Sequence, residues 1–357
     1  MCSFNNHNVR SYAVILFCIL SFIEFQSAFA ITIMTYNTEN LFDIDDNPSK
    51  QDESYLPLNK KKKEFCTSIP VRKWKETCLN LNWDREKLRV KIKRLSQVIT
   101  SCCEGFGPDI LVLQEVENKK VLELLRRQLN LSSVYKPGIL INSDDPRGIN
   151  IAVLTKLSII DKPILYPIPF IATGKNKILH SRGILRVDIK NIANYRTNKE
   201  QVFSILAVHF PSNRHAHSYR LQAMRFLTKI AKGLPQDHIV IAAGDFNNTQ
   251  KEENQFKLYK NFSQQYWTVS HLLDLENPSK ILGTHYLTTK NQWSFLDTIL
   301  IRNSDIQAKK LKIKSIQIIN TIENQINEYG QPIGFLNAAQ QPHGVSDHLP
   351  MLLTLIL

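Results

Sequence analysis

Short apolar runs alternate with turn residues along most of the chain. Eight of these runs are rich in β-branched residues, are bounded by Gly, Pro, Asn, Asp or Ser, and are too short to be typical helices. We expect buried strands at 31–36, 109–113, 149–155, 184–189, 202–208, 238–243, 295–301 and 351–357.

Two other stretches show helical spacing, which predicts an amphipathic helix with one core-facing stripe in each. Their apolar positions are Leu88, Ile92, Leu95 and Ile99 in the first stretch and Leu221, Met224, Leu227 and Ile230 in the second. Strands outnumber helices, and many strands follow one another directly, so a strictly alternating doubly wound sheet fits poorly. The pattern favours an α/β fold in which two mixed β-sheets pack face to face with helices outside, a four-layer sandwich.

The first thirty residues have a different pattern. Arg10 precedes an apolar run over 12–23, and Ala28 and Ala30 supply the small-x-small spacing of a cleavage site. The run is shorter than the roughly 20 residues that span a bilayer. We therefore predict a signal peptide over 1–30, with an uncleaved membrane anchor as the alternative, and a secreted or periplasmic domain over 31–357.

A basic insertion interrupts this domain at 47–82. It contains Trp74 and two cysteines, which pure linkers usually lack, so we expect it to be ordered. Lys60, Lys61, Lys62 and Lys63 form the densest basic run, and the whole chain carries a formal net charge of +13. A charge of this size is typical of proteins that meet polyanions such as nucleic acid or acidic lipid headgroups, although it also serves solubility alone.

Four cysteines remain after the first thirty residues, an even set that predicts disulfides in an oxidising compartment. Cys102 and Cys103 are adjacent and are expected to be poorly placed to bond to each other. We therefore expect each of them to pair with Cys66 or Cys78, which would tie the insertion to the helix that ends near Cys102.

Acid, amide and imidazole groups lie at or near the ends of six expected strands. Any single cluster is typical of a turn or of the first exposed position after a strand. Six in succession predict side chains that converge over the edge of a sheet. These side chains are Asn37, Glu115, His209, Asp245 with Asn247, Asp297, and Asp347 with His348.

Two of the clusters carry more detail. Gly244 allows a close backbone approach, and Asp245 and Asn247, two apart on extended backbone, are expected to point the same way. Asp297 has apolar neighbours on both sides. Because an isolated buried carboxylate is costly, it needs a partner such as an imidazole N–H.

In order and composition these motifs resemble the endonuclease/exonuclease/phosphatase superfamily. Gly-Asp-Phe-Asn at 244–247 and Ser-Asp-His-Leu-Pro at 346–350 are the most specific pieces, and Thr-Tyr-Asn at 35–37 and Gln-Glu-Val at 114–116 support them. The resemblance covers 31–357 and implies a deoxyribonuclease-like fold, as in exported bacterial-type members. The superfamily includes deoxyribonucleases, abasic-site endonucleases, bacterial sphingomyelinases and inositol polyphosphate 5-phosphatases.

The resemblance also implies a metal site. Asn37 and Glu115 offer hard oxygen ligands for Mg²⁺ or Mn²⁺, and Asp347 completes or supports the shell. His348, with Asp297 as its buried partner, is expected to act either as general base on water or as an imidazolium that stabilises transition-state charge.

The remaining catalytic roles follow from the same resemblance. Asp245 and Asn247 are expected to orient water, and His209 to stabilise transition-state charge and protonate the leaving group. The family leaves open whether the aspartate or a histidine deprotonates the nucleophile. Similar exported members often carry an acid at the position of Asn150, and if that acid orients the histidine, the role of His209 as a proton donor is weakened.

Substrate phosphate has three candidate contacts. Arg147 and Arg182 each precede an expected strand and could grip a phosphate with a bidentate fork, although both could also be ordinary surface arginines. Asn150 joins them at the start of the strand that follows Arg147.

The motifs and the charge together predict a secreted metal-dependent phosphodiesterase, in the first place an endonuclease that acts as a monomer on DNA. A lipid-directed enzyme of sphingomyelinase or phosphoinositide phosphatase type shares the same core and is the alternative. Such enzymes usually add an exposed aromatic hairpin, for which Tyr266 and Trp267 are the compact candidate. A non-catalytic binding module is disfavoured, since the expected acids, amides and imidazoles are present except at Asn150.

Overall fold

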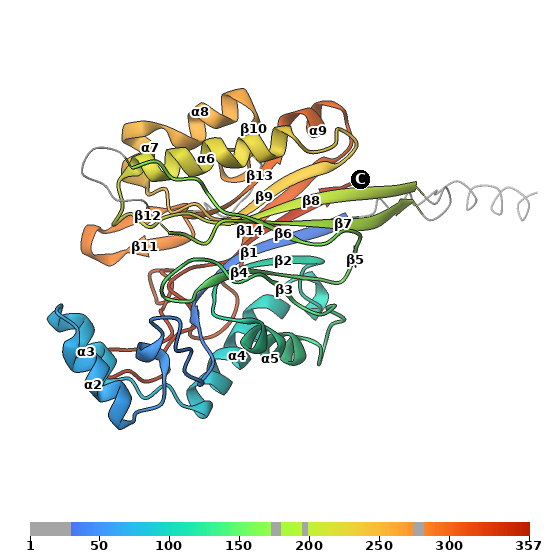
Figure 1. Ribbon diagram of the computed structural model, residues 1–357. Coiled ribbons are helices and arrows are strands. Elements are labelled where there is room, and N and C mark those ends of the chain that lie inside the picture. The colour runs from blue at the N-terminus through green and yellow to red at the C-terminus, as the bar shows by residue number, and fades with distance from the viewer. Residues whose placement is uncertain (1–29, 173–179, 195–198, 274–281) are drawn as a thin grey trace, which may run out of the picture.

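The computed structural model describes residues 30–172, 180–194, 199–273 and 282–357. The predicted signal peptide over 1–30 thus lies outside the described residues, apart from Ala30, which opens the first strand. Two large mixed sheets pack face to face, and helices cover both outer faces (Figure 1). The predicted four-layer α/β sandwich is confirmed.

The first sheet has the order β14-β15-β1-β2-β4-β3. Its strands β1 and β2 run parallel, and β15 pairs antiparallel with β1, so the start of β15 lies at the carboxyl end of β1. The bounds are Ala30–Leu41 for β1, Ile110–Val116 for β2, Ile139–Leu140 for β3, Asn150–Thr155 for β4, Lys312–Ile318 for β14 and Met351–Ile356 for β15.

The second sheet has the order β10-β13-β9-β8-β7-β5, with β6 also paired to β7. Here β8 and β9 are parallel, and β13 is antiparallel to β9. The bounds are Ser158–Ile159 for β5, Ile164–Tyr166 for β6, Ile184–Asn194 for β7, Lys199–His209 for β8, Ile239–Asp245 for β9, Trp267–Val269 for β10 and Asp297–Arg302 for β13. A separate hairpin joins β11 (His285–Leu287) to β12 (Gln292–Ser294).

Helices α4 (Arg85–Thr100) and α5 (Lys119–Leu129) cover the first sheet, and α6 (His217–Lys232), α7 (Gln250–Phe256) and α8 (Leu258–Gln265) lie over the second (Figure 1). The insertion forms α2 (Lys60–Ser68) and α3 (Arg72–Asn80), and α9 (Asn303–Gln307) follows β13. Short 3₁₀ turns lie at Glu53–Tyr55 (η1), Cys103–Gly105 (η2), Ser270–Leu272 (η3) and Thr288–Lys290 (η4). Within the described residues, every helix is too short or too polar to cross a bilayer.

Alternation along each strand explains why the sheets stack. In β9, Ile239, Ile241 and Ala243 pack into the core between the two sheets, whereas Val240 and Ala242 pack into the core beneath α6 and α8. A third core lies between the first sheet and helices α4 and α5. Because both faces of the central strands are buried, these strands have the continuous apolar runs seen in the sequence.

The insertion contains the two helices α2 and α3, and its disulfide differs from the prediction. Cys66 bonds to Cys78 across 12 positions, whereas Cys102 and Cys103 are free thiols next to each other. The bond therefore fastens α2 to α3 and does not tie the insertion to α4. Both cysteines lie near the carboxyl ends of their helices, and the packing of α2 against α3 brings the two Cα atoms to 5.5 Å, within the usual range for a bridge.

The lysine run is not a free cationic surface. Lys62 is fully buried, and its ammonium donates to the carbonyl oxygens of Ser54, Leu56 and Leu81. Lys61 pairs with Asp46. One lysine of the four thus anchors helix α2 to the two ends of the insertion, which removes its ammonium from any contact with a polyanion.

Candidate active site

Strand ends from both sheets meet at one cleft. Parallel strands β1 and β2 in one sheet and β8 and β9 in the other end there, and β15 begins beside the end of β1. The cleft has a volume of about 520 Å³. Among the predicted site residues it is lined by Asn37, Glu115, Arg147, Arg182, His209, Asp245, Asn247, Asp347 and His348.

A close approach of β8 and β9 places two of these side chains together. His209 and Asp245 are partners in the parallel register, and His209 Nε2 lies 3.5 Å from Asp245 Oδ2. The preceding residue, Gly244, has φ +151°, and a Cβ there would stand 1.9 Å from the carbonyl oxygen of Val208. Only glycine therefore fits at this position, as the sequence predicted.

His348 is the partner that buried Asp297 requires. Its Nδ1 lies 2.6 Å from Asp297 Oδ2, and Asp297 is completely buried. Burial alone would lower the pKa of His348, but the negative charges of Asp297 and Asp347 raise it well above the usual 6.5. His348 is therefore a cation at neutral pH.

His209 has the opposite charge state. Burial, followed by the positive charges of Arg182, Arg147 and His348, lowers its pKa well below 6.5. Its Nδ1 is buried and has no hydrogen-bond partner among the described residues. Its Nε2 faces the carboxylates of Asp245 and Glu115, the latter at 3.9 Å, so Nε2 carries the proton of the neutral ring.

Asp245 is held between two amides. Its Oδ2 accepts from the side chain of Asn37 at 3.1 Å, and its Oδ1 accepts from the backbone N–H of Asn247 at 2.8 Å. Burial and the nearby charge of Asp297 raise the pKa of Asp245 to about 7. The carboxyl group is thus suited to exchange a proton at neutral pH.

The predicted geometry of Asn247 was wrong in one respect. Asn247 has a left-handed backbone with φ +51°, so Asp245 and Asn247 are not two positions on one extended strand. Their side chains meet the same cleft because the chain turns after β9, and the Asn247 amide donates to the carbonyl of Phe210 at 3.1 Å. Asparagine tolerates this conformation better than most residues.

The predicted metal ligands fit a hard divalent cation. Glu115 has a strained left-handed backbone at φ +63°, and its Oε2 accepts from Asn40 N–H at 3.0 Å while Oε1 makes only the long contact to His209. Asn37 and Asp347 add an amide and a half-exposed carboxylate to the same cleft. Carboxylate and amide oxygens are the ligand types that Mg²⁺ and Mn²⁺ prefer.

Two other groups of side chains could also hold a metal ion among the described residues. One comprises His285, Asp347 and His348, and the other Asp245, Asp297 and His348. His348 belongs to both, and its Nδ1 is already bound to Asp297. The oxygen set around Glu115 therefore remains the better candidate.

Sequence reasoning missed Glu39 as a functional residue. Its Oε2 accepts from the backbone N–H groups of Phe335 at 2.6 Å and Asp347 at 3.1 Å, which fixes the position of Asp347. Burial and the charge of Asp347 raise the pKa of Glu39 to about 7. The signal was present, because Glu39 stands two residues after Asn37 in the same polar cluster.

The predicted phosphate contacts separate into two kinds. Arg147 is half-exposed at the rim of the cleft and is available to a ligand. Arg182 is buried, and its guanidinium already donates to the carbonyls of His209 and Phe210 and to Asp145. Arg182 therefore positions the end of β8, and its guanidinium N–H groups are already engaged and are not available to bind phosphate.

Asn150 does not reach the cleft. It is 3% exposed, its Oδ1 accepts from Ser143 N–H, and its amide donates to the carbonyls of Glu117 and Gly148. These bonds shape the loop that carries Arg147. Its predicted contact with phosphate is corrected to this supporting role, since its amide already bonds to this loop and to the carbonyl of Glu117.

One rim contact could not be predicted. The Arg214 guanidinium lies 5.0 Å from the centre of the Trp74 ring, and Arg214 lines the cleft. Trp74 belongs to α3, so the insertion reaches the edge of the active-site cleft. Trp74 remains 48% exposed and presents an aromatic surface there.

The fold and the site together define a class of protein: a four-layer α/β sandwich with an oxygen-lined, histidine-containing cleft at one edge of its sheets. The chain belongs to the endonuclease/exonuclease/phosphatase family, which its sequence matches over residues 75–356. Enzymes of this family are metal-dependent phosphoesterases. No curated protein matches the chain in sequence.

Solved structures share the fold at low identity. A Bacteroides thetaiotaomicron endonuclease/exonuclease/phosphatase family protein has a TM-score of 0.56 at 15% identity, covering 92% of this chain and 98% of that one. Humanized D. rerio TDP2 gives 0.55 at 14%, covering 92% and 99%. The B. thetaiotaomicron mannosyl-6-phosphatase Bt3783 gives 0.53 at 15%, covering 92% and 100%. Because these neighbours differ in their described activities, the fold alone does not fix the substrate.

Proposed function

We propose that the protein is an exported nuclease that uses Mg²⁺ or Mn²⁺ to hydrolyse phosphodiester bonds of nucleic acid, with DNA as the first candidate substrate, and that it acts as a monomer. One observation carries the hydrolytic part. Within one cleft, His348 is cationic, His209 is neutral, and Asp245 has a pKa near neutrality. Groups with pKa values pushed apart in this way are typical of acid–base sites.

The proposed chemistry divides among these residues. A divalent ion held by Asn37, Glu115 and Asp347 would supply positive charge to the substrate phosphate. Asp245 accepts a proton from the attacking water, which Asn247 helps to orient. This arrangement favours the aspartate over a histidine as general base.

The two histidines then have electrostatic roles. His348, held as an imidazolium by Asp297, stabilises the negative charge that builds on phosphorus-bound oxygens. His209 offers its neutral Nε2–H to the same region. It does not serve as a cationic acid for the leaving group, because its pKa lies well below 6.5.

The rim of the cleft supports nucleic acid as the substrate. Arg147 and Arg214 are exposed cations beside the catalytic groups, and Trp74 adds an aromatic face next to Arg214. Exposed arginines and aromatic rings are the elements with which proteins hold a phosphate backbone and stack bases. The formal charge of +13 favours a polyanion in the same way.

The lipid-directed alternative loses its structural support. Trp267 is fully buried and its indole N–H donates to Thr228, so Tyr266 and Trp267 do not form an exposed aromatic hairpin. The hairpin that does stand beside the cleft, β11 to β12, has a polar tip at Thr288–Lys290. A polar tip gains nothing from burial in a bilayer.

Export is supported by the pattern of residues 1–30 and by the Cys66–Cys78 disulfide, since such bonds persist mainly in oxidising compartments. To test the substrate class, the purified domain over 31–357 is incubated with plasmid DNA, RNA, sphingomyelin, inositol phosphates and mannose 6-phosphate, each with Mg²⁺ and with chelator.

We expect metal-dependent cleavage of nucleic acid and loss of that cleavage in His348→Ala. Turnover that is fastest on a lipid or on a small phosphate monoester, with intact DNA and RNA, would reject the nuclease. Full activity in excess chelator would reject the metal-dependent chemistry itself.

A further inference from the structure

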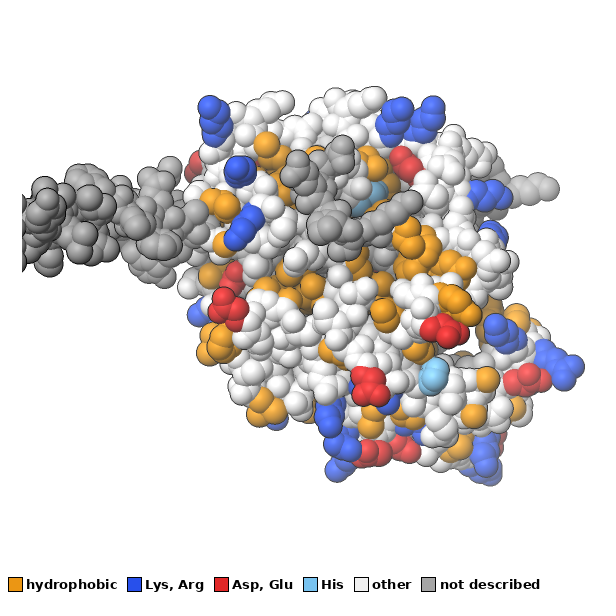
Figure 2. Space-filling view, turned by 180° about the vertical axis from the view of Figure 1, so that it is seen from behind, with side chains coloured by type: hydrophobic (Ala, Val, Ile, Leu, Met, Phe, Trp, Pro, Cys, Tyr) orange, Lys and Arg blue, Asp and Glu red, His pale blue; other side chains and the backbone are white. Residues whose placement is uncertain are grey.

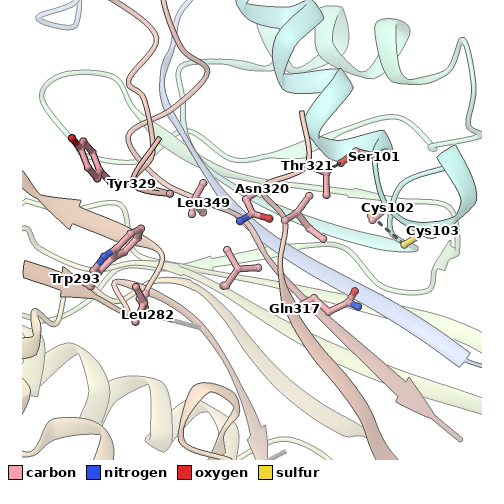
Figure 3. A pocket seen from close by; sticks show the side chains of 14 residues that line it. Ser101, Cys102, Cys103, Leu282, Trp293, Gln317, Asn320, Thr321, Tyr329 and Leu349 are labelled. Carbon is pink, nitrogen blue, oxygen red and sulfur yellow. Dashed lines mark hydrogen bonds between the residues drawn. The ribbon is translucent and has the colours of Figure 1, made fainter. Parts of the chain in front are cut away.

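A second hollow lies beside the active-site cleft and is separate from it. It has a volume of about 480 Å³ and shares no lining residue with the active-site cleft, although Leu349 in its wall directly follows His348. Figure 2 shows the molecule from behind, with hydrophobic side chains gathered across the middle of that face and most Lys and Arg side chains toward its outline. Figure 3 shows Cys102 and Cys103 at one end of the hollow and Trp293 and Tyr329 at the other.

The two thiols are placed side by side by the turn that ends α4. Cys102 is extended and 8% exposed, and Cys103 follows with a left-handed backbone at φ +54°. This change of direction turns both side chains the same way and brings the two sulfurs to 3.2 Å. The two thiols are nevertheless free, in agreement with the expectation that adjacent cysteines are poorly placed to bond to each other.

The two sulfurs differ in reactivity. The Cys103 thiol donates to Cys102, and this contact lowers the pKa of Cys103 to about 7, whereas the same contact together with burial raises the pKa of Cys102. A thiolate is the nucleophile in thiol chemistry, and an attacking thiol works best when its pKa is near the ambient pH. Cys103, which is half-buried and lines the hollow, is thus the sulfur that attacks.

The lining indicates what chemistry the hollow would accept. Its described side chains are uncharged: besides the cysteines they include amides at Gln317 and Asn320 and the aromatic rings of Trp293 and Tyr329. The described lining therefore favours a small, uncharged ligand that uses hydrogen bonds and apolar contact.

We propose that Cys102 and Cys103 form a thiol–disulfide exchange site whose co-substrate is a small uncharged disulfide bound in this hollow. The Cys103 thiolate attacks one sulfur of R–S–S–R, which forms a mixed disulfide and releases R–S⁻. The first R–S⁻ takes up the proton of the Cys102 thiol, and the Cys102 sulfur attacks Cys103 Sγ, which breaks the mixed disulfide and releases the second R–S⁻. This second thiolate takes up a proton from water. Two protein thiols are oxidised to one internal disulfide, and one small disulfide is reduced to two thiols.

The product would be more easily reduced than the other disulfide of the protein. Adjacent Cα atoms are held about 3.8 Å apart by the peptide unit, which is shorter than the usual separation in disulfides, and a strained bond is more reducible. Cys66 and Cys78 lie in the usual range at 5.5 Å. The exchange site is therefore reversible under conditions that leave the disulfide of the insertion intact.

The test uses the full domain and bis(2-hydroxyethyl) disulfide as the uncharged probe. The protein is exposed to the probe at neutral pH, the reaction is stopped with acid, and free thiols are blocked. The mass of the tryptic peptide over 95–119 is then measured by mass spectrometry. We expect the wild-type peptide to lose two hydrogens and to carry no adduct. Cys102→Ser, with Cys102→Ala beside it because this position is buried, should accumulate the mixed disulfide on Cys103.

Cys103→Ser should react at least about tenfold more slowly than Cys102→Ser. The Cys66–Cys78 disulfide serves as an internal control and should stay unchanged throughout. Equal rates at the two positions, a wild-type reaction that stops at a stable adduct, or faster reaction with charged oxidised glutathione than with the uncharged probe would each overturn the proposal. Hydrolytic turnover in the same samples reports whether each variant is folded.

Discussion

Asp297 controls the charge of His348 through one short hydrogen bond. In Asp297→Asn the negative charge is lost while burial remains, and burial lowers the pKa of an imidazole. We expect the pKa of His348 to fall, because only Asp347 and Asp245 then remain to oppose the effect of burial, so that the neutral fraction of the ring at pH 7 increases. An NMR titration of the ring protons in metal-free protein measures this shift.

Turnover in the same variant should fall by about 10²-fold or more, because a neutral ring no longer stabilises developing negative charge. Asp237→Asn is the matched control, since Asp237 is an exposed carboxylate remote from the site. If Asp297→Asn keeps both a protonated His348 and normal turnover, the proposed role of the pair is wrong.

Glu115 is the carboxylate on which the proposed metal site depends. Glu115→Gln keeps the size of the side chain and removes its charge, so affinity for Mg²⁺ should fall by at least about tenfold. Isothermal titration calorimetry on the free protein measures the loss directly. Glu328→Gln, an exposed acid outside the cleft, should bind Mg²⁺ as wild type does. Equal affinities in the two variants would remove Glu115 from the ligand set.

Among the structural elements, the strands and helices that follow from the local pattern of apolar and polar residues were predicted best from the sequence. All eight expected strands and both expected helices are present. Helix α5 was missed, although Val121, Leu122, Leu125 and Leu129 are buried on one of its faces and Asn118 caps its start. Helix α5 begins only a few residues after β2 ends, and its apolar residues alternate with charged ones. For this reason the sequence did not show it as a separate helix that packs on the first sheet.

Contacts between distant segments were predicted less well. The His348–Asp297 pair could be anticipated, because a buried acid needs a partner. The roles of Arg182 and Asn150 could not, since an arginine or amide before a strand looks the same whether it faces a ligand or the carbonyls of a neighbouring loop. The contact between Trp74 and Arg214 spans 140 positions and depends on how the insertion folds back, which no local pattern records.

The insertion offers an element-scale prediction through Lys62. Lys62→Met leaves three carbonyl oxygens without their donor, so the free energy of unfolding should fall by about 2 kcal/mol. Urea unfolding measures the total, and hydrogen exchange should show the loss concentrated in α2 and α3. Lys63→Met changes an exposed lysine one position away and should alter stability by less than about 0.5 kcal/mol. Similar losses in both variants would contradict the anchoring role.

At the scale of the whole molecule, the placement of charge matters more than its total. The lysine run at 60–63 contributes less to a substrate surface than its density indicates, because Lys62 is buried and Lys61 is paired with Asp46. Arg147 and Arg214 stand at the cleft itself. Lys309 and Lys312, near α9 and at the start of β14, are exposed and do not line the cleft. These two pairs allow local and overall charge to be separated.

A track for nucleic acid at the cleft predicts a steep response of binding to salt. Each neutralised phosphate displaces condensed counterions, so duplex DNA binding by the catalytically silent His348→Ala protein should have a log–log slope of about −3 or steeper, at roughly −0.9 per contact. Adding Arg147→Gln and Arg214→Gln should make the slope shallower by about 1.8, whereas Lys309→Gln with Lys312→Gln, equal in charge change, should leave it unaltered. Fluorescence anisotropy at several salt concentrations measures all three proteins. Equal slopes in the two double variants would show that net charge alone attracts DNA. Binding that does not depend on salt in any of the three proteins would contradict a nucleic-acid substrate and favour a small or lipid phosphate.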